Sequence, residues 1–147
     1  MTSQAPRSFD PLTTALYLED GGRAQALPLD ADFWPALADG RIDVDRGWLT
    51  MVAPMRADMA HWEMHPEGEE LLLARSGAFE IVMESGEGEH RVRLDRDAPA
   101  FVMPRGTWHR FVVLEPGEVL FVTYGRGTQH RPLEDATRGG GDAAGME

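Results

Sequence analysis

The sequence predicts an all-β fold, a sandwich or barrel, with one short helix near the N-terminus. A series of short stretches rich in β-branched, aromatic and other apolar residues runs from residue 48 to residue 124, and the breaks between them carry glycine, proline or aspartate. The chain has 147 residues and no cysteine, so a single domain can bury a core without disulfide bonds.

The elements are expected in the following order. Residues 1–10 are a polar, poorly ordered leader, and residues 14–18 and 23–29 form a hairpin around the turn at 19–22. Residues 32–39 form a short helix, since Asp32 can cap it, Pro35 is tolerated in its first turn and Gly40 suits its end. Strands are expected at 48–55, 59–65, 69–75, 78–84, 89–94, 100–103, 109–114 and 118–124.

These elements make one barrel domain over residues 11–132, and the tail at 133–147, rich in Gly, Asp, Ala and Glu, is expected to be disordered. No segment approaches the length of a membrane span and no secretory signal is seen, which predicts a cytoplasmic protein without a membrane partner. The formal net charge of −11 argues against binding to nucleic acid. All 14 basic residues are arginine, so Schiff-base chemistry on lysine is excluded.

Residues 61–70 gather side chains that bind metals or carry protons. Alternation along a strand points His61, Glu63 and His65 to one face and Trp62 and Met64 to the other. At about 3.3 Å per residue, Glu63 and His65 are about 6.6 Å apart along the strand and can close on one ion, whereas His61 lies about 13 Å from His65. After the turn at Pro66–Gly68, the next strand can bring Glu70 back to the same pocket.

A second stretch, residues 104–109, contains a Pro/Gly turn that leads into a strand. His109 is then expected to face inward at the start of this strand, together with Phe111 and Val113.

Together the two stretches resemble the motifs of the cupin superfamily. His65, four residues, Glu70, six residues and Gly77 match the first motif, with Glu63 where its first histidine usually stands. Pro104, Gly106 and His109 match the second motif, and the resemblance covers residues 48–123. Alanines at 57 and 98 and Val113 depart from the usual glycines and asparagine. The resemblance implies a cupin double-stranded β-helix (a jelly-roll barrel) whose motifs at 61–77 and 104–109 hold a metal.

A single inward histidine is more often a hydrogen-bonded core residue than a ligand, but inward carboxylates and imidazoles together need partners. Two facing carboxylates would force one to keep a proton at neutral pH, and a divalent cation removes that conflict. We therefore predict one divalent metal per chain, with the ligands Glu63, His65, Glu70 and His109. A shifted register would replace Glu70 by Glu69.

The remaining histidines receive other roles. We expect His61 at the rim of the site, where it or Glu63 is the catalytic acid–base group. His90 is expected to be structural, and His130, beyond the last predicted strand, to lie at the surface.

The ligand types suit Fe, Mn, Ni, Cu, Co or Zn, and two histidines with one carboxylate are the set used by non-haem Fe(II) oxygenases. We expect a metal-dependent oxygenase-type enzyme acting on a small organic molecule. The alternatives are a non-redox isomerase, cyclase or lyase, and a ligand-binding or sensory cupin without turnover; the fold does not choose among these.

Strand parity also predicts an outward apolar face, made of Trp62, Met64, Leu71, Leu73, Trp108 and Val112. Its cover is either the N-terminal hairpin and helix or a second subunit. Since cupins of this kind are often dimers, we favour a homodimer.

Overall fold

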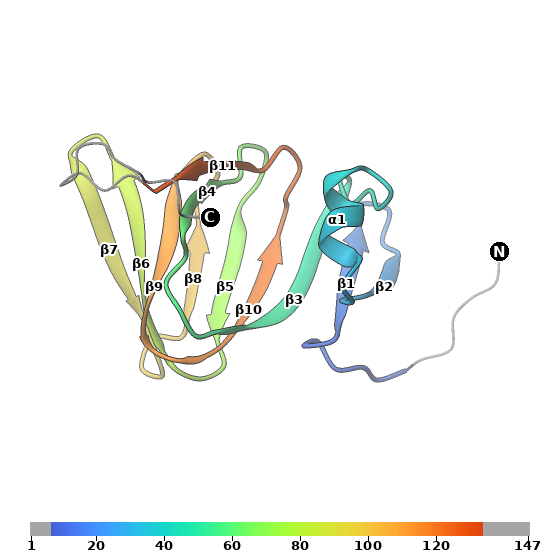
Figure 1. Ribbon diagram of the computed structural model, residues 1–147, viewed down its shortest axis with the longest axis horizontal. Coiled ribbons are helices and arrows are strands. Elements are labelled where there is room, and N and C mark those ends of the chain that lie inside the picture. Colours follow the sequence, from blue (N-terminus) through green and yellow to red (C-terminus); the bar gives the residue numbers. More distant parts are fainter. Residues whose placement is uncertain (1–6, 134–147) are drawn as a thin grey trace.

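The computed structural model describes residues 7–133, which form two facing antiparallel sheets and one short helix (Figure 1). The first sheet has the strand order β2-β1-β3-β10-β5-β8. Its strands are β1 (Thr14–Glu19), β2 (Ala24–Pro28), β3 (Gly47–Met55), β5 (Glu70–Ala74), β8 (Ala100–Met103) and β10 (Gly117–Thr123). The second sheet has the order β11-β4-β9-β6-β7. Its strands are β4 (His61–Met64), β6 (Ala78–Ser85), β7 (Gly88–Leu94), β9 (His109–Glu115) and β11 (Gln129–Pro132).

The main core lies between the two sheets and follows the alternation expected of half-buried strands. In β5, Glu70 and Leu72 are buried while Leu71 is only partly so, and in β9 His109 and Phe111 are buried. The fully packed members of this core are Leu72, Phe79, Ile81, Met83, Leu94, Met103, Phe111 and Val119. The inward parity predicted for the strands of the two motifs is therefore what the structure has.

The turn between β5 and β6 shows why the first motif ends in glycine. Gly77 has φ +85°, a conformation that L side chains rarely adopt. A Cβ at this position would also lie 2.7 Å from the carbonyl oxygen of Glu115. Glycine is therefore required at 77, which fixes where β5 ends relative to Glu70.

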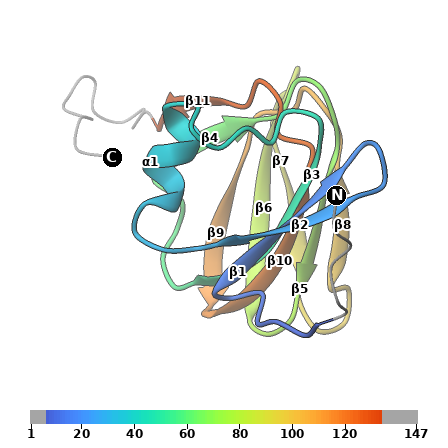
Figure 2. The same cartoon turned by 90° about the vertical axis from the view of Figure 1, so that its right-hand side faces the viewer.

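The N-terminal segment extends the first sheet and builds a smaller core of its own. β1 pairs with β3, and β2 pairs with β1. Helix α1 (Phe33–Ala38) buries Phe33 against Ala15 and Met51. Seen from the N-terminal side, β1 and β2 lie across that end of the barrel with α1 beside them (Figure 2). The expected hairpin and short helix are thus confirmed.

One detail of the helix differs from the prediction. Asp32 stands at the N-cap position, but its side chain makes no capping hydrogen bond. Its carboxylate instead pairs with the Arg41 guanidinium at 2.9 Å. The Asp32 carboxylate therefore forms an ion pair with Arg41 and does not cap the helix as predicted.

The predicted strands are present with ends shifted by one or two residues, but one strand was missed. β11 pairs with β4 and brings His130 opposite Glu63. The prediction that His130 lies past the last strand is therefore wrong, although its side chain is 55 % exposed. Its sequence, three polar residues followed by Pro132, shows no apolar alternation, so no local pattern predicted this strand.

The predicted outward apolar face is covered in part by arginines. Trp62 is buried, and the guanidinium groups of Arg110 and Arg131 lie 5.1 and 5.3 Å from its ring centroid. Arg131 also lies 4.6 Å from the centroid of the Trp108 ring. Arginines therefore cover Trp62, which neither alternative anticipated. The N-terminal helix packs on the first sheet, whereas Trp62 lies on β4 of the second sheet.

Within residues 7–133 no helix has the length and apolar character needed to span a bilayer. The predicted leader is described only from residue 7, and the predicted disordered tail lies outside the described residues except for Leu133.

Candidate metal centre

Three buried side chains converge at one end of the barrel and form what we call the inner cluster: His65, Glu70 and His109. His65 directly follows β4, Glu70 opens β5 and His109 opens β9. Their side chains are 5, 4 and 2 % exposed. Glu69, the alternative that a register shift would have placed here, is exposed.

The facing atoms lie close enough to share one ion. Glu70 Oε1 is 3.3 Å from His65 Nε2 and 3.4 Å from His109 Nε2. Glu63 Oε1 is 3.8 and 4.0 Å from the same two nitrogens. Ligand atoms lie about 2.0–2.2 Å from a transition-metal ion, so two atoms bound to one ion are at most about 4.4 Å apart. All four distances satisfy this limit.

The Nδ1 atoms of His65 and His109 are engaged in hydrogen bonds, which leaves their Nε2 atoms as acceptors facing the site. His109 Nδ1 lies 2.9 Å from the carbonyl oxygen of Thr107, to which only an N–H can donate. The Thr128 hydroxyl donates to the Gly125 carbonyl at 2.8 Å, so at 2.8 Å it accepts from His65 Nδ1. In the neutral imidazoles both Nε2 atoms therefore carry lone pairs, as histidine ligands require.

The carboxylate is oriented in the same way. Thr123 Oγ1 donates to Glu70 Oε2 at 2.6 Å, which leaves Glu70 Oε1 directed at the two imidazoles. Thr123 can do this because it is the cross-strand partner of Glu70 on β10.

These orientations fit a divalent cation. With neutral imidazoles, a carboxylate oxygen and two nitrogen lone pairs face one another in a buried site, which is unfavourable without a positive charge between them. Among the described residues His65 Nε2 is a buried polar atom without a hydrogen-bond partner, since its approach to Glu70 lacks hydrogen-bond geometry. The donor set of imidazole and carboxylate suits Fe, Mn, Co, Ni, Cu or Zn.

The charges in the metal-free site respond to one another. Burial by itself would raise the pKa of Glu70, but the imidazoles of His109 and His65 lower it to about 2. Burial would lower the pKa of His109, but Glu70 above all, with Thr107 and Glu63, raises it. These shifts favour a carboxylate beside a protonated imidazole when no cation is bound.

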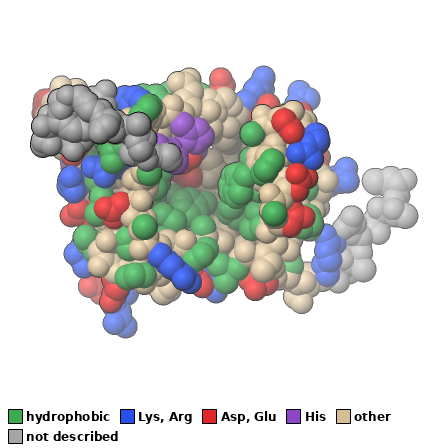
Figure 3. Space-filling model, in the orientation of Figure 1, with side chains coloured by type: hydrophobic (Ala, Val, Ile, Leu, Met, Phe, Trp, Pro, Cys, Tyr) green, Lys and Arg blue, Asp and Glu red, His purple; other side chains and the backbone are tan. Residues whose placement is uncertain are grey.

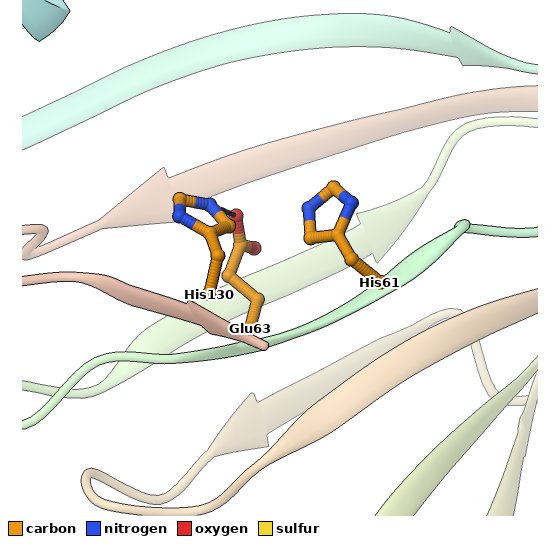
Figure 4. Close-up of side chains that lie close together, drawn as sticks. All are labelled: His61, Glu63 and His130. Carbon is orange, nitrogen blue, oxygen red and sulfur yellow. Dashed lines mark hydrogen bonds and ion pairs between the residues drawn. The ribbon is translucent and has the colours of Figure 1, made fainter. Parts of the chain in front are cut away.

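A second group, the outer cluster, consists of His61, Glu63 and His130 (Figure 4). Glu63 on β4 is paired with His130 on β11 and with His109 on β9, so a histidine stands beside it on each neighbouring strand. Its Oε2 lies 3.0 Å from His130 Nε2, a contact that raises the pKa of His130. The His61 ring lies 4.9 Å from the His130 ring, between centroids.

The structure thus brings together Glu63, His65, Glu70 and His109, and it places His61 in a group with Glu63 and His130. His130 was not predicted for any site. Its partner Glu63 is 67 positions away in sequence, and only the pairing of β11 with β4 joins them.

The site opens toward solvent on the side of Glu63, whose side chain is 27 % exposed. In Figure 3 histidine is visible at the surface beside a hollow around which hydrophobic side chains gather. A pocket of about 310 Å³ also lies at the adjoining turns, but none of the four predicted ligands lines it; its walls are Trp48, Glu67, Gly68, Glu69, Arg105 and Tyr124.

No family model matches the chain, and no curated protein matches it. Among solved structures it is similar to Peruvianin-I, described as a cysteine peptidase from Thevetia peruviana latex, with 18% identity, 89% of this chain and 74% of that chain covered, and a TM-score of 0.50. It is similar to a cupin-2 domain containing protein from Shewanella frigidimarina NCIMB 400, at 16% identity, with 52% and 69% of the chains covered and a TM-score of 0.44. A third similar structure is hydroquinone 1,2-dioxygenase from Sphingomonas sp. TTNP3, at 18% identity, with 50% and 57% covered and a TM-score of 0.42.

The two facing antiparallel sheets, with a His/Glu group able to hold a metal at one end, define an all-β jelly-roll barrel. A jelly-roll barrel is the fold that the two motifs predicted.

Proposed function

We propose that this chain binds one divalent transition-metal ion through His65, Glu70 and His109, with Glu63 as fourth ligand, and acts on a small organic molecule as an oxygenase-type enzyme. The observation that carries the proposal is the buried convergence of two imidazole acceptors on one carboxylate oxygen. When bound, the ion would supply redox chemistry with dioxygen. His65, His109 and Glu70 alone make the two-histidine, one-carboxylate set of non-haem Fe(II) oxygenases, and Glu63 would add a second carboxylate to it.

The residues of the site have different roles according to how deeply they are buried. The inner cluster is buried and held by threonine and backbone hydrogen bonds, so it fixes the ion rigidly. Glu63 lies on the solvent side, where a substrate would enter, and can take a proton from it if it is not a ligand. Cysteine-peptidase activity is excluded because the chain has no cysteine.

A second candidate function is a non-redox isomerase, cyclase or lyase. The hydrogen bond between Glu63 Oε2 and the half-exposed His130 supports it, because this pair offers a route for a proton between the inner cluster and solvent. In that function the ion would polarise a carbonyl group and Glu63 or His61 would move the proton.

The test starts from protein produced with a mixed metal supplement, followed by elemental analysis. We expect close to one tightly held ion per chain that raises the melting temperature, because a ligand that binds only the folded state stabilises it. Iron or copper, with oxygen uptake on a panel of small phenols and organic acids, is the expected result. Zinc or nickel without oxygen uptake would favour the second candidate. Protein that gains no thermal stability from any divalent ion would overturn both.

We also propose a homodimer, supported by the partly buried Leu71 and Leu73 and by Val102, which is 52% exposed. Light scattering at micromolar concentration is expected to give twice the chain mass of 16.3 kDa. A mass of one chain would contradict the homodimer.

A further inference from the structure

The outer cluster offers the ligand atoms of a second metal site. One ligand atom each from His61, Glu63 and His130 lie within 4.8 Å of one another, and His130 Nε2 is 3.0 Å from Glu63 Oε2. The arrangement follows from the strands, because His130 is the cross-strand partner of Glu63 and His61 lies two residues away on the same face of β4. In Figure 4 both imidazoles flank the Glu63 carboxylate.

A hydrogen bond between Glu63 and His130 does not by itself explain the cluster. In the part of the chain that the structure describes, the His61 side chain makes no hydrogen bond, and its ring packs edge-on against that of His130. Two imidazoles together with one carboxylate are a donor set for Zn, Cu, Ni or Co. The half-exposed position of His130 leaves room for water as the remaining ligand.

Glu63 faces both clusters with different oxygens. Its Oε1 is directed at the inner imidazoles, 3.8 Å from His65 Nε2, and its Oε2 at His130. We propose that the outer cluster binds a second divalent transition-metal ion and that the Glu63 carboxylate is shared between the two ions. The inference does not depend on the oxygenase function, since only Glu63 belongs to both sets of ligands.

The experiment uses metal-free full-length protein and counts bound Zn(II) by calorimetric titration and by elemental analysis after dialysis. We expect two ions per chain in the wild type and one in His130→Ala and in His61→Ala. His130 is more than half exposed, so its removal leaves the core intact. The matched control is His90→Ala, which removes an exposed histidine on β7 and should still bind two ions.

Glu70→Ala separates the two sites. It should lose the inner ion and keep the outer one, and the double variant Glu70→Ala/His130→Ala should bind none. A wild type with one ion that is lost in Glu70→Ala but retained in His130→Ala would overturn the outer site and leave the proposed function standing. A wild type with one ion that is retained in Glu70→Ala but lost in His130→Ala would overturn the inner site instead.

The shared carboxylate has its own readout. Two Cu(II) ions that share a carboxylate lie close enough for magnetic coupling, so the electron paramagnetic resonance spectrum of the wild type with two equivalents should lose intensity and broaden. His130→Ala with one equivalent should give the spectrum of an isolated ion. Two uncoupled Cu(II) signals in the wild type would show that Glu63 does not join the sites.

Discussion

The inner and outer clusters use the same ligand chemistry, two imidazoles with a carboxylate, but the chain holds them very differently. In the inner cluster the His65 and His109 side chains are 5 and 2 % exposed, and each imidazole donates its Nδ1 proton to a fixed oxygen. In the outer cluster His130 is 55 % exposed and bonds only to Glu63 among the described residues, while His61 packs against the His130 ring.

The difference shows how preorganisation sets affinity. Ligands that are already oriented lose little conformational freedom when the ion binds, whereas exposed side chains must be ordered first. We therefore expect the inner site to bind a given metal more tightly than the outer site, although both supply the same kinds of atom. The following predictions test this comparison, from the largest effect to the smallest.

Glu70→Ala should abolish the inner site while sparing the outer one. The change removes a ligand and leaves two buried imidazole lone pairs without a charge between them, so inner metal affinity should fall by more than about 1000-fold, or about 4 kcal/mol. Competition with a chelator of known affinity measures it. Glu69→Ala, one residue away and exposed, is the matched control and should bind like the wild type. An equal loss in both variants would contradict the assignment of Glu70.

Acid should destabilise the metal-free protein through the inner cluster. The pKa of Glu70 is about 2 in the folded chain and 4.5 ordinarily, so its stabilising contribution is present above about pH 4.5 and is lost as the pH falls toward 2. The expected loss is on the order of 3 kcal/mol. Denaturant titrations at several pH values measure the free energy of unfolding. Glu70→Gln should lack this dependence and His130→Ala should keep it; an unchanged slope in Glu70→Gln would contradict the prediction.

Glu63→Gln should weaken both sites, because it removes the charge that faces both clusters. If Glu63 is a ligand, inner metal affinity should fall by well over the roughly 10–100-fold typical of residues outside the ligand set. Glu63→His, which restores the usual cupin residue, should keep the inner ion but lose the outer one, since an imidazole cannot bridge as a carboxylate does. Metal titration decides this without a known substrate. Wild-type affinity in Glu63→Gln, with only turnover reduced, would make Glu63 a base.

Thr128→Val should lower inner affinity by a smaller factor, about 10–100-fold, because it removes the hydroxyl that orients His65 without removing a ligand. Thr128→Ser keeps the hydroxyl and is the control. The affinity of the outer site, measured in a Glu70→Ala background, should not change. If Thr128→Val bound metal like the wild type, the hydrogen bond to His65 Nδ1 would have no part in holding the site rigid.

The sequence by itself determined the barrel and the inner cluster. Strand alternation has a fixed period of two, so the positions of Glu70 and His109 relative to Leu72 and Phe111 decide which side chains face inward. Gly77 fixes the turn because its positive φ and the nearby Glu115 carbonyl exclude a side chain. These are local effects, and a local pattern is enough to read them.

Only the tertiary structure decided the outer cluster and the orientation of the ligands. β11 is short and mostly polar, so no hydrophobic periodicity predicted it. The contact of His130 with Glu63 exists only because β11 pairs with β4, a strand distant in sequence. Thr123 and Thr128 likewise meet Glu70 and His65 across more than 50 positions. The sequence can show which way a side chain points from its strand, but which partner it meets depends on how the strands pair and on the register of that pairing.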